Sequence, residues 1–172
     1  MMSNDHRSNS NLDDFAISIE LFSWVKENIS EGSFVLEFGS GSGTIELCKH
    51  YNVYSVEHDE QWIEYCDKSN YIYAPIVDYG SFQWYDREIV KNKVPNDYDL
   101  IIVDGPPNNP DTQVIGRHGF IENISMFNTN VPIIFDDVNR DDEYKNMLDA
   151  AAVLNKNYEV FEGWQKSFAV VS

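Results

Sequence analysis

The chain has 172 residues, of which 42% are hydrophobic, so it is long and apolar enough to bury the core of one domain. Lys and Arg total 12 against 29 Asp and Glu, a formal charge of −17 that repels phosphate backbones and argues against DNA or RNA as partners. No apolar run approaches the ~20 residues of a membrane-spanning helix. The polar opening residues do not resemble a signal peptide, and Cys48 and Cys66 lie in no metal-binding motif, so we expect a cytoplasmic protein with reduced thiols.

Helical and strand patterns alternate along residues 11–172, which we expect to form a single domain after a frayed tail at residues 1–10. Helices are predicted where apolar residues recur at helical spacing, and strands where short apolar runs are bounded by turn residues. In chain order the predicted elements are a helix over 12–29 that Gly32 ends, a strand over 34–38, a Gly/Ser loop over 39–43, a helix over 44–51, a strand over 53–57, a helix over 59–67, a strand over 71–76 that Pro75 interrupts, a strand over 100–104, a short helix over 120–127, a strand over 132–136, a helix over 142–155, and strands over 158–161 and 168–171 that pair as a hairpin through Gly163.

Strands that alternate with helices predict crossover connections, and therefore a mostly parallel sheet covered by helices on both faces, a three-layer α/β sandwich. In such sheets, ligands bind beyond the carboxyl ends of the strands. A structural protein gains nothing from a row of carboxylates along this edge, so such a row predicts a binding site. The predicted parallel strands all end at or near an acidic residue: Glu37, Glu57, Asp78, Asp104 and Asp136.

The loop at residues 37–43, Glu-Phe-Gly-Ser-Gly-Ser-Gly, joins a predicted strand to a predicted helix. Its glycines let the backbone turn tightly and let a ligand approach main-chain N–H groups. A dinucleotide-binding fingerprint would need a glycine at position 44, where Thr44 stands. The acid Glu37 beside the loop suits a cation, such as the α-ammonium of a methionine moiety, better than a pyrophosphate. Glu57, about 20 residues further on, can accept hydrogen bonds from both hydroxyls of a ribose.

These motifs resemble those of the class I, Rossmann-like, S-adenosylmethionine-dependent methyltransferases, and are most similar to small proteins related to O-methyltransferases. The resemblance rests on residues 35–43, 55–59, 103–107 and 134–140. It implies a seven-stranded sheet whose last strand is antiparallel, with S-adenosyl-L-methionine as the cofactor.

The resemblance also implies a role for individual residues in holding the cofactor. Glu37 and the glycine loop would hold the methionine end, and Glu57 would bind the ribose. His58 would lie near the adenine, and Asp78 or Tyr79 would contact its edge or face. The alternatives are a turn residue at Asp78, and core or lid aromatics at Tyr79, Phe82, Trp84 and Tyr85. The implied cofactor-binding residues are Glu37, Gly39, Ser40, Gly41, Gly43, Glu57, His58, Asp78 and Asp104.

Candidates for the acceptor side follow the later strands. Asp104 ends the fourth predicted strand and could act as the base for a hydroxyl acceptor, which loses its proton as it attacks. Residues 105–108, Gly-Pro-Pro-Asn, depart at both ends from the Asp/Asn-Pro-Pro-aromatic tetrad of enzymes that methylate nucleic-acid bases. In the loop over 108–119, Arg117 could clamp an anionic acceptor and His118 could act as a general base. A solvated histidine and an arginine paired with local acids are equal alternatives.

Asp136 and Asp137 follow the fifth predicted strand. Catechol-type O-methyltransferases place a magnesium ligand after the fourth strand and an Asp-Asn pair after the fifth, and Asp104 with these two residues is similar, except that Asp137 stands where an Asn is expected. Carboxylate oxygens suit a hard cation such as Mg²⁺. The sequence leaves open whether a metal is bound. Without one, Asp136 or Asp137 would orient the acceptor.

The sequence thus predicts a methyltransferase that acts on a small molecule or sugar, with oxygen favoured over nitrogen. A protein or peptide side chain as acceptor, and a non-catalytic cofactor-binding module, are the alternatives. The catalytic candidates are Asp104, His118 and Asp137, and the substrate-binding candidates are Arg117, His118 and Asp136. A chain of this length leaves little room for an acceptor domain, so we expect a shallow acceptor site completed by the N-terminal segment, the loop over 108–119 or a second subunit of a homodimer.

Overall fold

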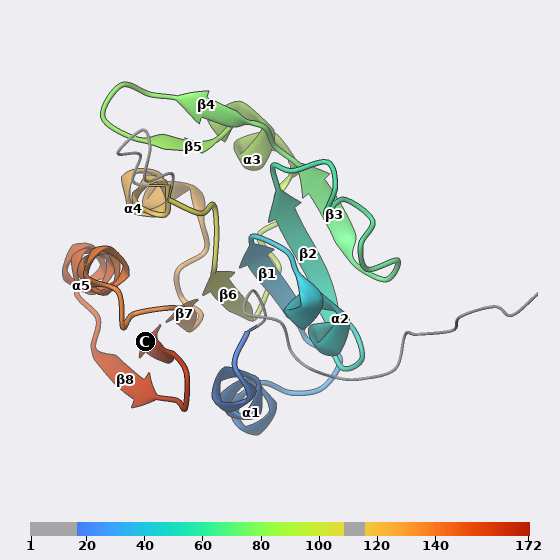
Figure 1. The fold of residues 1–172 in the computed structure, drawn as a ribbon, viewed down its shortest axis with the longest axis vertical. Coiled ribbons are helices and arrows are strands. Elements are labelled where there is room, and N and C mark those ends of the chain that lie inside the picture. Colours follow the sequence, from blue (N-terminus) through green and yellow to red (C-terminus); the bar gives the residue numbers. More distant parts are fainter. Residues whose placement is uncertain (1–16, 109–115) are drawn as a thin grey trace, which may run out of the picture.

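The structure, a computed structural model, describes residues 17–108 and 116–172. The predicted tail at 1–10, the start of the helix over 12–29 and most of the loop over 108–119 lie outside these residues. The chain forms a seven-stranded sheet in the order β3-β2-β1-β6-β7-β9-β8 (Figure 1). Its strands are β1 (Phe34–Phe38), β2 (Asn52–Glu57), β3 (Asn70–Tyr73), β6 (Leu100–Val103), β7 (Ile133–Phe135), β8 (Tyr158–Glu162) and β9 (Ser167–Val171). Within this sheet, β9 alone runs in the direction opposite to the other strands. The predicted α/β fold with a mostly parallel sheet is therefore confirmed.

Two hydrophobic clusters pack on opposite faces of this sheet. One face is covered by α1 (Ile19–Asn28) and α2 (Ser42–Leu47), and the other by α3 (Arg87–Lys93), α4 (His118–Glu122) and α5 (Asp141–Leu154). In β6, Leu100 and Ile102 face the first cluster, whereas Ile101 and Val103 face the second. Alternate residues of a strand point to opposite faces, so a strand buried on both faces has a continuous apolar sequence. None of the helices in residues 17–108 and 116–172 is long and apolar enough to cross a bilayer.

The predicted helix over 59–67 is wrong, because this segment forms consecutive turns. The Trp62 N–H donates to the Asp59 carbonyl at 3.0 Å, and the Tyr65 N–H donates to the Trp62 carbonyl at 3.2 Å. Glu64 has a φ of 65°, in the left-handed region, which a right-handed helix cannot continue through. The apolar spacing of the segment therefore reflects packing of turns and not a helical face.

The third predicted strand, over 71–76, is divided at Pro75. β3 ends at Tyr73, and β4 (Ile76–Asp78) pairs with β5 (Gln83–Tyr85) in a separate two-stranded sheet. Proline has no N–H to donate to a ladder, so it marks the point where the chain leaves the main sheet. The sequence pattern indicates neither β5 nor α3.

Two helix boundaries also differ from the prediction. The helix α1 ends at Asn28, and Ile29 already has extended backbone, so Gly32 lies in the turn beyond and does not itself end the helix. The short helix predicted over 120–127 begins earlier, as α4, and then tightens into a 3₁₀ turn at Ile124–Met126.

Backbone hydrogen bonds continue past the carboxyl ends of the strands and align the residues that follow them. The Gly39 N–H donates to the Val56 carbonyl at 2.9 Å, and the Asp104 N–H donates to the Phe38 carbonyl at 3.0 Å. The Asp136 N–H donates to the Val103 carbonyl at 3.2 Å. The segments after β1, β2, β6 and β7 therefore meet at one edge of the sheet, where the sequence predicts the site.

Candidate active site

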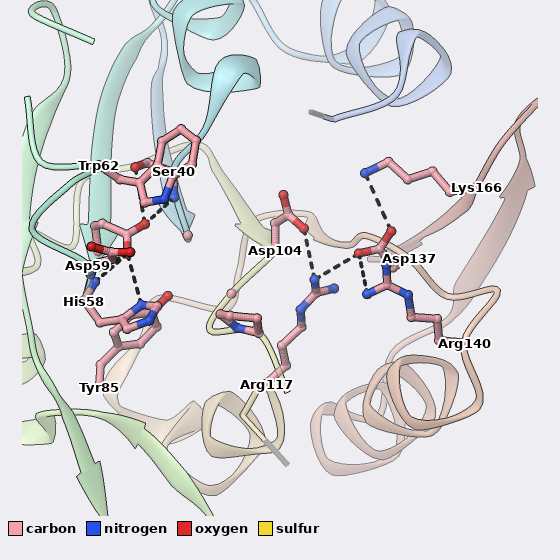
Figure 2. Close-up of a pocket in the computed structure, with 14 residues that line it drawn as sticks. Ser40, His58, Asp59, Trp62, Tyr85, Asp104, Arg117, Asp137, Arg140 and Lys166 are labelled. Carbon is pink, nitrogen blue, oxygen red and sulfur yellow. Dashed lines mark hydrogen bonds and ion pairs between the residues drawn. The ribbon is translucent and has the colours of Figure 1, made fainter. Parts of the chain in front are cut away.

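A cavity of about 540 Å³ opens at this edge. Its volume lies within the range of roughly 300–1,000 Å³ typical of small-molecule sites. Figure 2 shows two groups of side chains in its wall. One group follows β1, β2 and β5 and consists of Ser40, His58, Asp59, Trp62 and Tyr85, together with Glu57. The other is a cluster of charges: Asp104, Arg117, Asp137, Arg140 and Lys166.

Two glycines make the close backbone contact that forms the centre of the cavity wall. Gly39 has a φ of 87°, and a Cβ there would lie 3.0 Å from the Gly105 Cα. A Cβ on Gly105 would lie 2.8 Å from the Gly39 Cα and 2.6 Å from the Tyr85 hydroxyl. Any larger residue would push the loop after β1 away from the loop after β6, so only glycine permits this approach.

Glu57 is held as an ionised acceptor in the first group. Its side chain is buried, and its Oε2 accepts from the Ser40 N–H at 2.9 Å and the Ser40 hydroxyl at 3.3 Å. Its Oε1 accepts from the N–H groups of His58 at 2.7 Å and Asp59 at 2.8 Å. Burial on its own raises the pKa of Glu57, but hydrogen bonds from His58 and the backbone of Ser40 and Asp59 outweigh it and lower the pKa below its ordinary value. A carboxylate in this state can accept from a ligand hydroxyl.

Tyr85 presents an orphaned hydroxyl to the cavity. The side chain is fully buried, and among the described residues its hydroxyl has no hydrogen-bond partner. Burial raises the pKa of Tyr85 well above its ordinary value, so the group stays a neutral donor. Buried polar groups are nearly always paired, and this hydroxyl lines the cavity, so it is free to donate to a ligand there. The sequence leaves Tyr85 as a core or lid aromatic, and it does not identify Trp62, whose only signal is its place shortly after Glu57.

Glu37 stabilises the glycine loop through hydrogen bonds and does not itself line the cavity. Its Oε1 accepts from the Thr44 hydroxyl at 2.6 Å and from the Ser55 hydroxyl at 2.5 Å. Burial raises the pKa of Glu37 to about 7. The Thr44 hydroxyl in turn accepts from the Gly41 N–H at 3.1 Å. Neither Gly41 nor Gly43 lines the cavity either, so direct contact of these residues with a cofactor remains a prediction.

Arg117 is the centre of the charged group. It is buried, and its NH2 lies 3.1 Å from Asp104 and 3.0 Å from Asp137 (Figure 2). Its NH1 donates to the Asp136 carbonyl at 3.0 Å, and its Nε lies 3.6 Å from Glu143. With NH2 paired to two acids and NH1 bonded to a backbone carbonyl, Arg117 matches the predicted alternative of local pairing. A role as acceptor clamp would need one of these pairs to open.

The pKa values of the two carboxylates that Arg117 joins shift in opposite directions. Burial, together with the nearby Asp136, raises the pKa of Asp104 well above its ordinary value, although Arg117 opposes the change. For Asp137, burial acts in the same direction, but Arg117 and Lys166 outweigh it and lower the pKa. Asp104 is therefore the more basic of the two carboxylates, and Asp137 the more readily ionised. Pairs of acids with pKa values driven apart in this way are typical of catalytic sites.

Three more of the predicted residues, besides Glu37, Gly41 and Gly43, do not line the cavity. His118 lies in a separate hollow, with its Nε2 2.9 Å from Glu122 and its Nδ1 3.3 Å from Asn146. Asp78 is exposed at the end of β4, where it accepts from the Gly80 N–H at 2.7 Å. Asp136 is fully buried beneath the cavity wall. A short stretch of sequence places His118 next to Arg117, but the start of α4 turns the two side chains in different directions.

A divalent metal does not fit the carboxylates as they stand. Asp104, Asp136 and Asp137 each offer an oxygen within 4.8 Å of the others, which is a geometry that could hold an ion. Arg117, however, already joins two of these carboxylates, and Lys166 contacts Asp136 at 2.5 Å. An ion could enter only by displacing these cations, so we assign no metal to the site.

Comparison of the sequence with protein-family profiles and with curated proteins finds no match. Solved structures do match in fold. A methyltransferase from Pyrococcus furiosus superposes with a TM-score of 0.56 and 16% identity, over 89% of this chain and 80% of that one. A ribosomal protein L11 methylase from Lactobacillus delbrueckii subsp. bulgaricus gives a TM-score of 0.56 and 12% identity, over 88% and 75%. The SAH-bound Podospora anserina methyltransferase PaMTH1 gives a TM-score of 0.53 and 14% identity, over 91% and 80%.

The chain has the class I methyltransferase fold. At 12–16% identity, these likenesses concern the fold alone. In this fold the carboxyl edge of the parallel strands is the ligand edge, which is where the cavity and its two groups of residues lie.

Proposed function

We propose that this protein is an S-adenosylmethionine-dependent methyltransferase whose acceptor is a small molecule or sugar, methylated at oxygen. The observation that carries the proposal is one cavity lined both by an ionised acceptor, Glu57, and by Asp104, a carboxylate whose raised pKa makes it a stronger base than an ordinary aspartate. The first suits the hydroxyls of a ribose. The second suits an acceptor hydroxyl that must lose its proton.

The residues present fit the cofactor. Glu57 would accept from the ribose hydroxyls, and the orphaned Tyr85 hydroxyl offers a donor to a ligand atom. His58 and Trp62 supply ring faces beside Glu57 for the nucleoside base (Figure 2). The contact between Gly39 and Gly105 leaves a bare backbone surface against which the ligand can lie closely. When bound, the cofactor supplies a methyl group already activated on a sulfonium. The SAH-bound neighbour supports this choice.

The acceptor end of the cavity favours proton removal. Asp104 lines the wall and would accept the proton of an attacking hydroxyl at a carboxylate oxygen. Arg117 holds this carboxylate in place, and Asp137, which stays ionised, holds Arg117. Positioning of this kind, together with exclusion of water by the cavity wall, is the protein's main contribution to transfer of an activated group.

A protein or peptide side chain is the second candidate acceptor. The ribosomal protein L11 methylase has the same fold, and the present cavity opens to the surface at the edge of the sheet. Nucleic acid is disfavoured, since the formal charge of −17 repels its backbone. A cofactor-binding module without turnover would leave the raised pKa of Asp104 without a purpose.

Calorimetric titration with S-adenosylhomocysteine and with NAD tests the cofactor assignment. We expect binding of the first and no binding of the second. Release of S-adenosylhomocysteine from S-adenosylmethionine, measured across a panel of hydroxylated small molecules and of peptides, then tests the acceptor. The Asp104→Asn variant is the control. It should bind added S-adenosylhomocysteine as wild type does, and yet form none from S-adenosylmethionine. NAD binding, or full turnover by this variant, would contradict the proposal.

A further inference from the structure

Lys166 reaches from the β8–β9 hairpin to the acids that follow β7. Its Nζ lies 2.5 Å from Asp136 Oδ2, and its side chain is only 14% exposed. The same Nζ lies 3.6 Å from Asp137 Oδ1 (Figure 2). Asp136 is fully buried, so this ammonium is its counter-ion within the described residues. The second oxygen of Asp136, Oδ1, is buried and has no hydrogen-bond partner there.

Two arginines add further cations around the same acids, and Arg140 NH1 lies 3.3 Å from Asp137 Oδ2. Arg117 contacts two of the acids. Its NH2 contacts both Asp104 and Asp137, which together with Asp136 form the carboxylate trio. Oxygens of the trio come within 4.8 Å of one another, as they would around a bound ion. The centre of the trio, however, is shared between an ammonium and a guanidinium. A divalent ion placed there would be repelled by both at short range in a medium that screens charge poorly.

We propose that Lys166 is the resident cation of the carboxylate trio, and that it occupies the place of a divalent metal ion there. The proposal concerns the site of the proposed methyl transfer, but it rests only on contacts among the chain's own residues. The test measures metal binding and not methyl transfer. The assignment of Lys166 and the proposed methyltransferase function can therefore fail independently of each other.

Replacement of Lys166 should convert the trio into a metal site. Lys166→Met keeps the length and the apolar stem of the side chain but removes its charge, which leaves Asp136 without a counter-ion. We expect the variant to gain binding of Mn²⁺, about tenfold tighter or more than wild type, as a buried acid without its cation requires another. The melting temperature of the variant should rise with MnCl₂ and fall back with EDTA, because a ligand that binds only the folded state stabilises it.

The matched control is Lys49→Met. Lys49 also pairs with one carboxylate, Glu46, at 2.6 Å, but both side chains are exposed. This variant and wild type should show no EDTA-reversible shift with Mn²⁺ or Mg²⁺. A folded Lys166→Met that gains no Mn²⁺ binding, or a gain that Lys49→Met shares, would overturn the proposal.

If Lys166→Met does not fold, Mn²⁺ binding by the wild-type protein tests the proposal instead. The Lys166→Arg variant, which keeps the charge, should then behave as wild type does, with no metal-dependent shift in melting temperature and no Mn²⁺ bound in electron paramagnetic resonance titrations. Wild-type binding of Mn²⁺ that Asp137→Asn abolishes would show a true metal site and refute the proposal.

Discussion

Replacing Glu57 with glutamine tests the nucleoside end of the cavity directly. Glutamine keeps the size of the side chain, but it removes the charge and turns one acceptor oxygen into a donor. That donor must face either the Ser40 N–H or the N–H groups of His58 and Asp59, which now donate to Glu57 at 2.7–2.9 Å. A hydrogen bond to a charged group contributes about 1.5–3 kcal/mol, so S-adenosylhomocysteine should bind roughly 10- to 150-fold more weakly.

Isothermal titration at neutral pH measures this change. Circular dichroism and urea unfolding should accompany it, since the loss of the loop contacts lowers the free energy of unfolding by about 1 kcal/mol. The control is Glu60→Gln, which removes a nearby exposed carboxylate outside the cavity and should leave affinity unchanged. A folded Glu57→Gln variant that binds as tightly as wild type would show that the ribose lies elsewhere.

Three further predictions concern the residues that support the site. Arg117→Met should lower the free energy of unfolding at neutral pH by about 3–5 kcal/mol, because it leaves Asp104 and Glu143 without the cation that contacts them, and urea unfolding close to wild type would contradict this. The folded-state pKa of Glu37 is raised from 4.5 to about 7, so the folded state binds this proton more tightly and wild-type stability should fall as pH rises through that window. Glu37→Gln should remove this part of the pH dependence. If the free energy of unfolding, measured by urea at several pH values, changes equally with pH in both proteins, the assignment is refuted. Gly105→Ala would place a Cβ 2.6 Å from the Tyr85 hydroxyl and 2.8 Å from the Gly39 Cα, so both the melting temperature and the affinity for S-adenosylhomocysteine should fall, and wild-type values for both would contradict the close contact.

The cavity end at Glu57 could be anticipated from the sequence because its parts are close together along the chain. The glycine loop and the end of the second strand are recognisable from local composition and spacing, and the ladder then aligns Gly39 with Val56. The same reasoning places Asp78 at this edge, and there it fails. Pro75 diverts the chain into a separate hairpin, and the sequence shows the interruption but not the direction that follows.

The charged end could be anticipated only in part. Asp104 and Asp137 are visible as acids that follow strands, but the opposite shifts of their pKa values depend on burial and on Arg117, which no local pattern reports. His118 has the residue type of a general base, yet it pairs with Glu122 and Asn146 away from the cavity. A side chain's direction at the start of a short helix depends on how that helix packs.

The amino-acid sequence by itself determined the order along the chain of the strands in the main sheet, the double burial of that sheet and the edge at which a ligand would lie, because these follow from residue periodicity and from the handedness of crossover connections. Only the tertiary structure decided which charges neutralise one another and which polar group is left for a ligand. Lys166 and Asp136 are 30 residues apart and meet because β9 inserts beside β7. The Tyr85 hydroxyl is orphaned because β5 packs beneath the loops after β1 and β6. Both outcomes depend on strand order and packing, which act over distances that local patterns do not encode.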